Sequence, residues 1–308
     1  MSNINAINNS NSEISLSGIL SIIWKEKLLV LLLTSIFSIC SIIYALSLPN
    51  IYMSSSLLSI NDSQNNSSGL SRISGQYGNL ASMAGIDLPS GGSNDKASLA
   101  VEIALSRELV KNLLTKDNIL PVLMATKSYD PVNKKIKYDN KIYDDKRGIW
   151  VRKPMEGYQV IPSYLEAHKE YLKIVDIVKD KKTNFITIRV RHQSPYFSEY
   201  LLSLIIKELN EKVRLADLEE ATSSLNYLKS LQKETNIQGI KASINSLIEG
   251  KIESLMLANI KQDYILRPID PPYIPEMRFS PSRSNLVILI SFLGGFLSIL
   301  IVLIRNFA

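Results

Sequence analysis

Two long runs of apolar residues, one near each end of the chain, dominate the pattern of hydrophobic and polar positions. Residues 28–48 and residues 286–304 contain no Asp, Glu, Lys or Arg. As helices, these 21 and 19 residues would be roughly 28–32 Å long, which matches the ~30 Å hydrocarbon core of a bilayer. The pattern therefore predicts two transmembrane helices, with residues 49–285 forming a domain between them.

Positive charges at the first run predict its orientation. Lys25 and Lys27 precede the run, and no Lys or Arg follows it until Arg72. The positive-inside rule then places residues 1–27 in the cytoplasm, residues 49–285 on the other side and the tail 305–308 back in the cytoplasm. A cleavable signal peptide is the alternative, but the run and the region before it are both too long for one.

The longest predicted helix of the central domain covers residues 195–234. Ser194 is a good cap, Pro195 suits the first helical position, and no Pro or Gly follows until Gly239. A second amphipathic helix is predicted at 237–266. The apolar stripe of the first helix steps by three, four and three residues through Leu218, Ala221, Leu225 and Leu228. Self-association in a coiled coil would bury this stripe; two helices that pack on each other within a monomer are the alternative.

Shorter elements make the domain a mixture of helices and strands. Strands are predicted where β-favouring residues cluster or alternate with polar ones, and helices where apolar residues recur at helical spacing. Ser163 and Glu166 form a capping-box pattern that opens a short helix through residue 168. The remaining predictions are strands at 51–60, 171–178 and 183–191, a helical run from 95 through 114 that ends before Pro121, a surface helix at 13–24 and a loop at 61–94.

Prolines and small residues mark the approach to the second span and the span itself. The segment 268–283 contains Pro268, Pro271, Pro272, Pro275 and Pro281. Because proline fixes φ and lacks an N–H, this segment is predicted to be a stiff, extended spacer, with a ligand for a proline-reading module as the alternative.

Within the second span, small residues place one helix side in position for close helix–helix approach; an ordinary scatter of glycines is the alternative. They are Ser291, Gly294, Gly295 and Ser298.

The sequence contains no pattern that indicates catalysis, metal binding or nucleic-acid binding. The net charge of +6 is modest and both signs are mixed, which is not the pattern of a nucleic-acid binder. Cys40 is the only cysteine, and His168 and His192 lack metal-ligand spacing. We therefore expect no catalytic residue, cofactor or metal site. The aromatic and basic residues between Lys127 and Lys153 could bind a sugar or an anion, but a solvated, partly packed surface is the favoured interpretation.

Short motifs along almost the whole chain resemble the Wzz-type chain-length determinants of bacterial surface polysaccharides, the class 1 polysaccharide co-polymerases. The order and spacing of these motifs relative to the two spans carry the resemblance, because each alone is weak. They are Ile14-Ser15-Leu16, Trp24-Lys25, Tyr129-Asp130-Pro131, His192-Gln193-Ser194-Pro195, Leu209-Asn210 and Ile269-Asp270-Pro271 through Pro275-Glu276, Pro281 and Arg283.

The resemblance implies an α+β inner-membrane protein, with a periplasmic α/β base domain, a long extended helix and two flanking transmembrane helices. It also implies a ring-like homo-oligomer that works with the Wzy-type O-antigen polymerase, sets the length of lipopolysaccharide O-antigen without catalysis, and touches the growing polysaccharide. Two alternatives stay open: a periplasmic adaptor of a polysaccharide or protein exporter, and an enzyme acting on lipid-linked sugar.

Overall fold

The computed structural model describes residues 24–61, 93–116, 118–154, 156–234, 238–260 and 263–307. The predicted surface helix at 13–24 and the loop at 61–94 lie almost entirely outside these residues. The chain divides into two units, one formed by residues up to 50 together with residues from 279 onward, and the other by residues 51–278.

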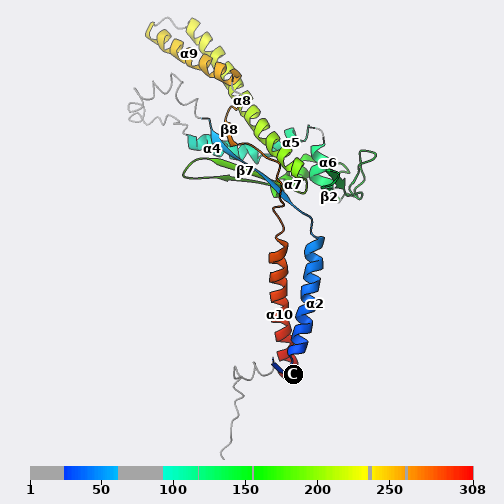
Figure 1. The fold of residues 1–308 in the computed structure, drawn as a ribbon. Helices are drawn as coiled ribbons and strands as arrows, with labels where there is room; N and C mark the ends of the chain where they lie inside the picture. The colour runs from blue at the N-terminus through cyan, green and yellow to red at the C-terminus, as the bar shows by residue number, and fades with distance from the viewer. Residues whose placement is uncertain are drawn as a thin grey trace, which may run out of the picture. The chain divides into compact units, whose positions relative to one another are not determined.

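The first unit is a pair of apolar helices, α2 (Lys27–Ser47) and α10 (Arg283–Phe307), which lie side by side (Figure 1). Both helices are long and apolar enough to cross a membrane. Helix α2 begins one residue before the predicted span, and α10 extends three residues beyond its predicted span at each end. Five of the six extra residues of α10 are polar or charged, the exception being Phe307, and they continue the helix past the apolar run.

The second unit is built around a four-stranded antiparallel sheet in the order β6-β7-β1-β8. The strands are β6 (Val175–Lys179), β7 (Ile186–His192), β1 (Tyr52–Ile60) and β8 (Leu266–Asp270). Alternation along β7 buries Ile186, Ile188 and Val190, as its sequence pattern predicts. The sheet thus joins residues from the start, middle and end of this unit.

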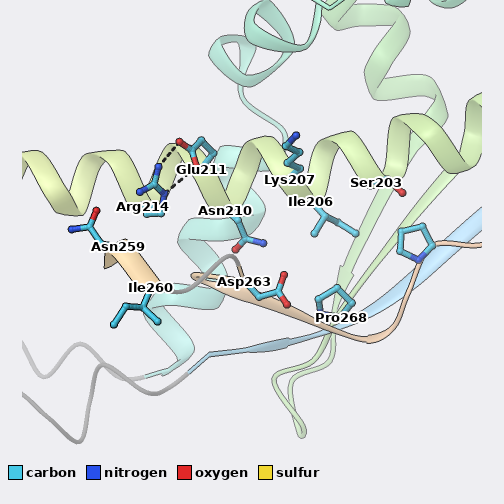
Figure 2. A pocket seen from close by; sticks show the side chains of 11 residues that line it. Ser203, Ile206, Lys207, Asn210, Glu211, Arg214, Asn259, Ile260, Asp263 and Pro268 are labelled. Carbon is cyan, nitrogen blue, oxygen red and sulfur yellow. Dashed lines mark hydrogen bonds and ion pairs between the residues drawn. The ribbon is translucent and has the colours of Figure 1, made fainter. Parts of the chain in front are cut away.

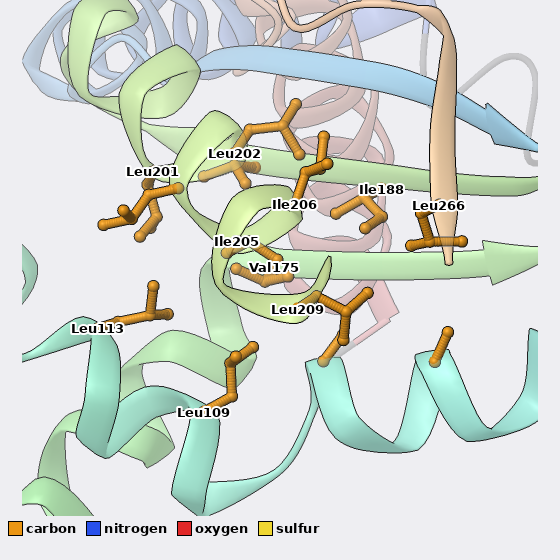
Figure 3. Packing of buried hydrophobic residues seen from close by; sticks show 14 of the residues in the cluster. Leu109, Leu113, Val175, Ile188, Leu201, Leu202, Ile205, Ile206, Leu209 and Leu266 are labelled. Atoms are coloured by element: carbon orange, nitrogen blue, oxygen red, sulfur yellow. The ribbon is translucent and has the colours of Figure 1, made fainter. Parts of the chain in front are cut away.

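Helices on one face of the sheet close the hydrophobic core. The first half of α8 (Pro195–Glu234) packs on β1 and β7, and Leu201, Leu202, Ile205 and Leu209 are each at most 1% exposed (Figure 3). Burying such a side chain contributes roughly 1.5–3 kcal/mol to stability. The other helices of this layer are α4 (Ser93–Ala104), α5 (Arg107–Leu113), α6 (Ile119–Ala125) and α7 (Tyr164–Ile174).

The second half of α8 leaves this core and pairs with α9 (Gln238–Ile260) as a helical hairpin. Two small antiparallel β-hairpins complete the unit, the first formed by β2 (Thr126–Asp130) and β3 (Lys135–Tyr138) and the second by β4 (Tyr143–Asp144) and β5 (Ile149–Trp150). The fold class predicted from the sequence is confirmed: helices and a sheet are mixed, one helix is very long, and candidate membrane helices lie near both ends.

The predicted helical run from 95 through 114 is wrong in one respect, because the structure divides it into α4 and α5. The Ser106 hydroxyl accepts a hydrogen bond from the amide of Leu109 at 3.2 Å and caps α5. Pro121 does not end a helix; it lies in the first turn of α6, where the backbone N–H groups have no partner within the helix.

The predicted strand at 171–178 is wrong over its first half, because α7 continues through Ile174. The capping box of Ser163 and Glu166 is confirmed at the start of α7. The helix extends beyond His168 because tertiary contacts hold its second half: the Tyr171 hydroxyl donates to the carbonyl of Ala104 at 2.8 Å, and His168 Nε2 lies 2.8 Å from the carbonyl of Leu105.

The predicted second long helix at 237–266 also ends too late. Helix α9 ends at Ile260, and Leu266 is already the first residue of β8. Strand pairing overrides the helical pattern here, since β8 completes the sheet beside β1 and Leu266 is fully buried. Only the complete fold brings β1 beside these residues.

Candidate functional site

The two histidines are packing residues in this fold. His192 is buried, its Nδ1 accepts a hydrogen bond from the amide of Ser194 at 3.0 Å, and its ring lies 4.5 Å from that of Phe197. Burial lowers its pKa to about 4, so the imidazole is neutral at neutral pH. Within the described ranges, no group of three or more His, Cys, Asp or Glu side chains has the arrangement of a metal site.

The proline-rich segment (residues 268–283) is attached to the sheet rather than extended in solvent over its first half. Pro268 lies in β8, which is an edge strand and therefore tolerates a residue without an N–H. Serine side chains of β1 add two further bonds: the Ser56 hydroxyl donates to the carbonyl of Asp270 at 2.6 Å, and the Ser54 hydroxyl donates to the carbonyl of Tyr273 at 2.7 Å. Both serines are at most 1% exposed.

The five predicted prolines divide between the two units. Pro275 is buried, Pro268 and Pro272 are partly buried and Pro271 is exposed, all in the unit that contains the sheet. Pro281 belongs to the unit of the two apolar helices. The first four prolines therefore belong to the unit that contains the sheet, and only the fifth belongs to the pair of apolar helices.

Small residues of α10 lie against α2. A Cβ added at Gly294 would be 2.5 Å from the Cβ of Phe37, and one added at Gly295 would be 3.4 Å from Cγ2 of Thr34. The Ser38 hydroxyl donates to the Ser291 hydroxyl at 3.0 Å across the pair. Ser298 is fully buried and its hydroxyl donates to the carbonyl of Gly295 at 2.7 Å.

A guanidinium joins the two apolar helices at one end of the pair. Arg283 Nη2 donates to the carbonyl of Leu48 at 3.1 Å and to Oδ1 of Asn50 at 3.0 Å. Leu48 is the C-cap of α2 and Arg283 is the first residue of α10. In the sequence, Arg283 stands out only as part of a motif, which does not predict these two bonds. The available signal was a cation between Pro281 and the second apolar run.

Within the helical hairpin, the predicted oligomer stripe is partly covered by the chain itself. Ala221 is 4% exposed, and Leu218, Leu225 and Leu228 are half-buried. Polar pairs join the two helices at Glu220–Lys251, 3.4 Å apart, and at Gln232–Asn245. The apolar side chains left exposed form a different set, which consists of Leu215, Tyr227, Ile240, Ile252, Met256 and Ile260.

The aromatic residues between Lys127 and Lys153 pack mainly on one another. The ring of Tyr143 contacts those of Tyr138 and Trp150 edge-on, with centroids 5.3 and 5.1 Å apart. The ring of Tyr129 lies 6.4 Å from that of Tyr52 and burial raises its pKa. These contacts occupy part of the ring surface that a sugar would need for stacking.

A groove lies between the first half of α8 and the proline-rich segment (Figure 2). Its volume is about 740 Å³. Lys207 and Glu211 lie along one rim, Asp263 and Pro268 along the other, and Asn210 between them (Figure 2). Sequence reasoning missed this groove; the one signal was Asn210, a polar residue at a position of α8 where the stripe is otherwise apolar.

Comparisons with solved structures find low similarity over long stretches. A full-length bacterial polysaccharide co-polymerase is 15% identical, with a TM-score of 0.40, and covers 95% of this chain and 97% of its own. A fragment of WzzB, a polysaccharide co-polymerase from Salmonella Typhimurium, is 13% identical, with a TM-score of 0.31, and covers 75% of this chain and 100% of its own. Both TM-scores are low, so neither likeness supports an inference about this chain.

A comparison with curated proteins gives no match. Residues 12–116 match a family model, that of Wzz, the chain length determinant protein. These residues contain α2, β1, α4 and α5. They therefore include the first apolar helix and β1, the strand that pairs with β7. Over residues 12–116, the match to this family model confirms the resemblance to chain length determinants that is seen in the sequence.

Proposed function

We propose that this protein regulates the chain length of a bacterial surface polysaccharide, the O-antigen of lipopolysaccharide, without catalysing its synthesis. The observation that carries the proposal is the match of residues 12–116 to the chain length determinant family. The protein would act as a partner of the Wzy-type O-antigen polymerase, which forms the glycosidic bonds. A scaffold role needs surfaces and spacing rather than reactive groups, which agrees with two histidines that serve packing.

The proposed location is the bacterial inner membrane, with α2 and α10 as its two spans. Lys25 and Lys27 at the start of α2 favour a cytoplasmic N-terminus, so residues 49–285 are periplasmic and residues 305–308 return to the cytoplasm. In this arrangement the sheet, the helical hairpin and the first half of the proline-rich segment face the compartment in which O-antigen is polymerised.

In the proposed mechanism, the apolar helices and the proline-rich segment hold the polymerase, while the long helices fix the geometry of a homo-oligomeric ring. The attachment of the segment to buried serines of β1 supports the first part, because a rigid surface can transmit position from the sheet to a bound partner. The exposed apolar residues of the hairpin support the second part, because contact between copies would bury them.

The test is the ladder of surface lipopolysaccharide on a gel, compared between a strain that lacks the protein and the same strain with it restored. We expect a random ladder without the protein and a clustered ladder with it, while polymer is made in both. An identical ladder in the two strains would refute the proposal. Loss of all surface polymer in the strain without the protein would instead support an exporter adaptor.

A further inference from the structure

The groove beside the proline-rich segment has the size of a ligand site. Its volume of about 740 Å³ lies within the range of roughly 300–1,000 Å³ for small-molecule sites. Two neighbouring rows of α8 face it, one with Ser203, Lys207 and Glu211 and the other with Ile206, Asn210 and Arg214. The opposite side is formed by Asn259 and Ile260 at the end of α9, by Asp263 and by two prolines (Figure 2).

The floor of the groove is rigid because a buried amide ties its two sides together. Asn210 Oδ1 accepts hydrogen bonds from the amides of Ile265 and Leu266, and its Nδ2 donates to the carbonyl of Leu266, each at 2.9 Å. Asn210 is 4% exposed. A second tie comes from the Tyr264 hydroxyl, which donates to Asp217 of α8 at 2.7 Å. The shape of the groove is therefore set before any ligand arrives.

Charges of both signs line the groove in equal number. Arg214 donates to both carboxylate oxygens of Glu211, at 2.6 and 3.0 Å, which lowers the pKa of Glu211 and raises that of Arg214. Lys207 and Asp263 are exposed, and within the part of the chain that the structure describes neither side chain has an ion pair or a side-chain hydrogen bond. Among the lining residues that the structure describes, two cations and two anions balance, so these side chains do not favour an anionic ligand.

Apolar surface alternates with these polar groups. Ile206 and Ile260 contribute aliphatic side chains, and Pro268 and Pro272 contribute rings. Ile260 is 73% exposed although it lies at the end of a helix beside the groove. A ligand that presents C–H faces on one side and hydroxyl groups on another would bury this apolar surface and also satisfy the ammonium and the carboxylate.

We propose that this groove binds the sugar units of the polysaccharide whose length the protein controls. A sugar hydroxyl both donates and accepts, so hydroxyls on different sides of a sugar can accept from Lys207 on one rim and donate to Asp263 on the other, while a C–H face of the ring packs on Pro268 and Pro272. The groove offers no aromatic ring for stacking among its lining residues, so each contact is weak and a growing chain can move along it. The inference rests on the proposed function and adds to it a place where glycan is held.

The test measures sugar binding directly. Full-length protein in lipid nanodiscs is mixed with O-antigen oligosaccharide released from the lipopolysaccharide of the producing strain, and saturation transfer from protein to sugar protons is recorded by NMR. We expect transfer with the unaltered protein and an about tenfold loss of affinity in the double variant Lys207→Gln, Asp263→Asn, which loses two charged hydrogen-bonding groups. Both side chains are exposed, so the variant should melt at the same temperature as the unaltered protein.

The control is the double variant Lys229→Gln, Glu219→Gln, which removes the same charges from exposed positions of α8 outside the groove. It should bind like the unaltered protein. The inference fails if the unaltered protein gives no transfer, or if the groove variant and the control bind equally. Competition by inorganic phosphate would also overturn it, because the groove would then be an anion site.

Failure of this inference can be told apart from failure of the proposed function. A clustered lipopolysaccharide ladder without saturation transfer would leave length control standing and remove the groove as a sugar site. A ladder that does not respond to the protein would remove length control, while the transfer experiment still decides whether the groove holds sugar.

Discussion

Two antiparallel helix pairs in this protein are held together in opposite ways. Between α2 and α10, glycines, hydroxyl groups and a bond between Ser38 and Ser291 contribute to the contact beside a few buried apolar side chains, while the large side chains Phe292 and Phe296 of α10 are 73% and 60% exposed. Between α8 and α9 the buried positions are apolar. Examples are Ala221 of α8 and Ile244 and Ala258 of α9. Charged and polar pairs lie at the edges of that hairpin.

The difference follows from the solvent that each pair fits. In lipid, there is no hydrophobic driving force that moves apolar side chains from the lipid into a helix–helix contact. Helices therefore associate where their backbones approach closely and hydroxyl groups pair. In water, removing apolar area from solvent is the driving force, and charges remain at the rim. An exposed large apolar side chain is therefore a lipid contact in the α2–α10 pair, whereas in the α8–α9 pair it is apolar surface that faces water.

The largest effect is expected from Gly294→Ala in the α2–α10 pair. The added Cβ would be 2.5 Å from the Cβ of Phe37, a distance that forces the two helices apart. The measurement is disulfide formation in the variant Ser38→Cys, Ser291→Cys, Cys40→Ser, whose two thiols replace hydroxyls 3.0 Å apart. We expect the cross-linked fraction to fall to about a fifth or less, because disulfide geometry tolerates little separation.

The matched control for that prediction is Gly295→Ala. Its added Cβ would lie 3.4 Å from Cγ2 of Thr34, which is at the edge of ordinary contact. Cross-linking should stay close to that of the parent. Equal losses at the two positions would show that the pair is sensitive to any change in α10 rather than to close approach at Gly294.

A smaller effect is expected from Ala221→Leu in the α8–α9 hairpin. Ala221 is 4% exposed, so a larger side chain overpacks the contact and costs roughly 1–3 kcal/mol. Ala221 is not part of the main core, although Ala258 of α9 is, so hydrogen exchange should speed up for amides of α9 but not for those of β7. Faster exchange in both elements would mean that the hairpin and the sheet unfold as one unit.

Next in size is Arg283→Leu, which removes two hydrogen bonds at one end of the α2–α10 pair. The carbonyl of Leu48 and the side chain of Asn50 lose a charged donor, at a cost of about 1–3 kcal/mol. The melting temperature of the purified protein should fall, and Arg283→Lys should recover part of the loss. An unchanged melting temperature in the leucine variant would show that water replaces the guanidinium without cost.

The smallest effect is expected from Glu220→Gln, which breaks the ion pair with Lys251. The Glu220 side chain is 73% exposed and the two charges are 3.4 Å apart. Such a pair contributes about 0–1 kcal/mol because solvent screens it. Exchange of α9 amides should therefore remain within error of the unaltered protein. A large acceleration would mean that the edge charges, rather than the apolar contact, hold this hairpin.

Elements with strong local signals were predictable from the sequence. The cap and proline at Ser194 and Pro195 predict the start of α8, and its end at Glu234 follows from the uninterrupted pattern. The alternation in β7 predicts both its existence and its buried face. The four small residues of α10 were predicted as one helix side, and the structure brings Ser291, Gly294 and Gly295 against α2.

The remaining features depend on partners far away in the sequence. Leu266 continues a helical pattern, but β1 is available as a neighbour and the residue becomes part of a strand. Tyr171 has a β-favouring side chain, yet its hydroxyl finds the carbonyl of Ala104 and the helix continues. The groove has the same origin: Asn210 shows only as a polar residue in the apolar stripe of α8 and Asp263 carries no local signal, because the fold alone brings the two residues to one groove.

The serine bonds to the proline-rich segment have a consequence for how this segment can change during evolution. Ser54 and Ser56 hold the carbonyl oxygens of Tyr273 and Asp270, and every residue type has a carbonyl oxygen. Replacements at these two positions therefore keep both bonds. One residue inserted between them would displace one carbonyl by about 3.3 Å and turn it away from its serine. Natural variation at 270–273 is thus expected as exchanges of residue type and not as insertions or deletions.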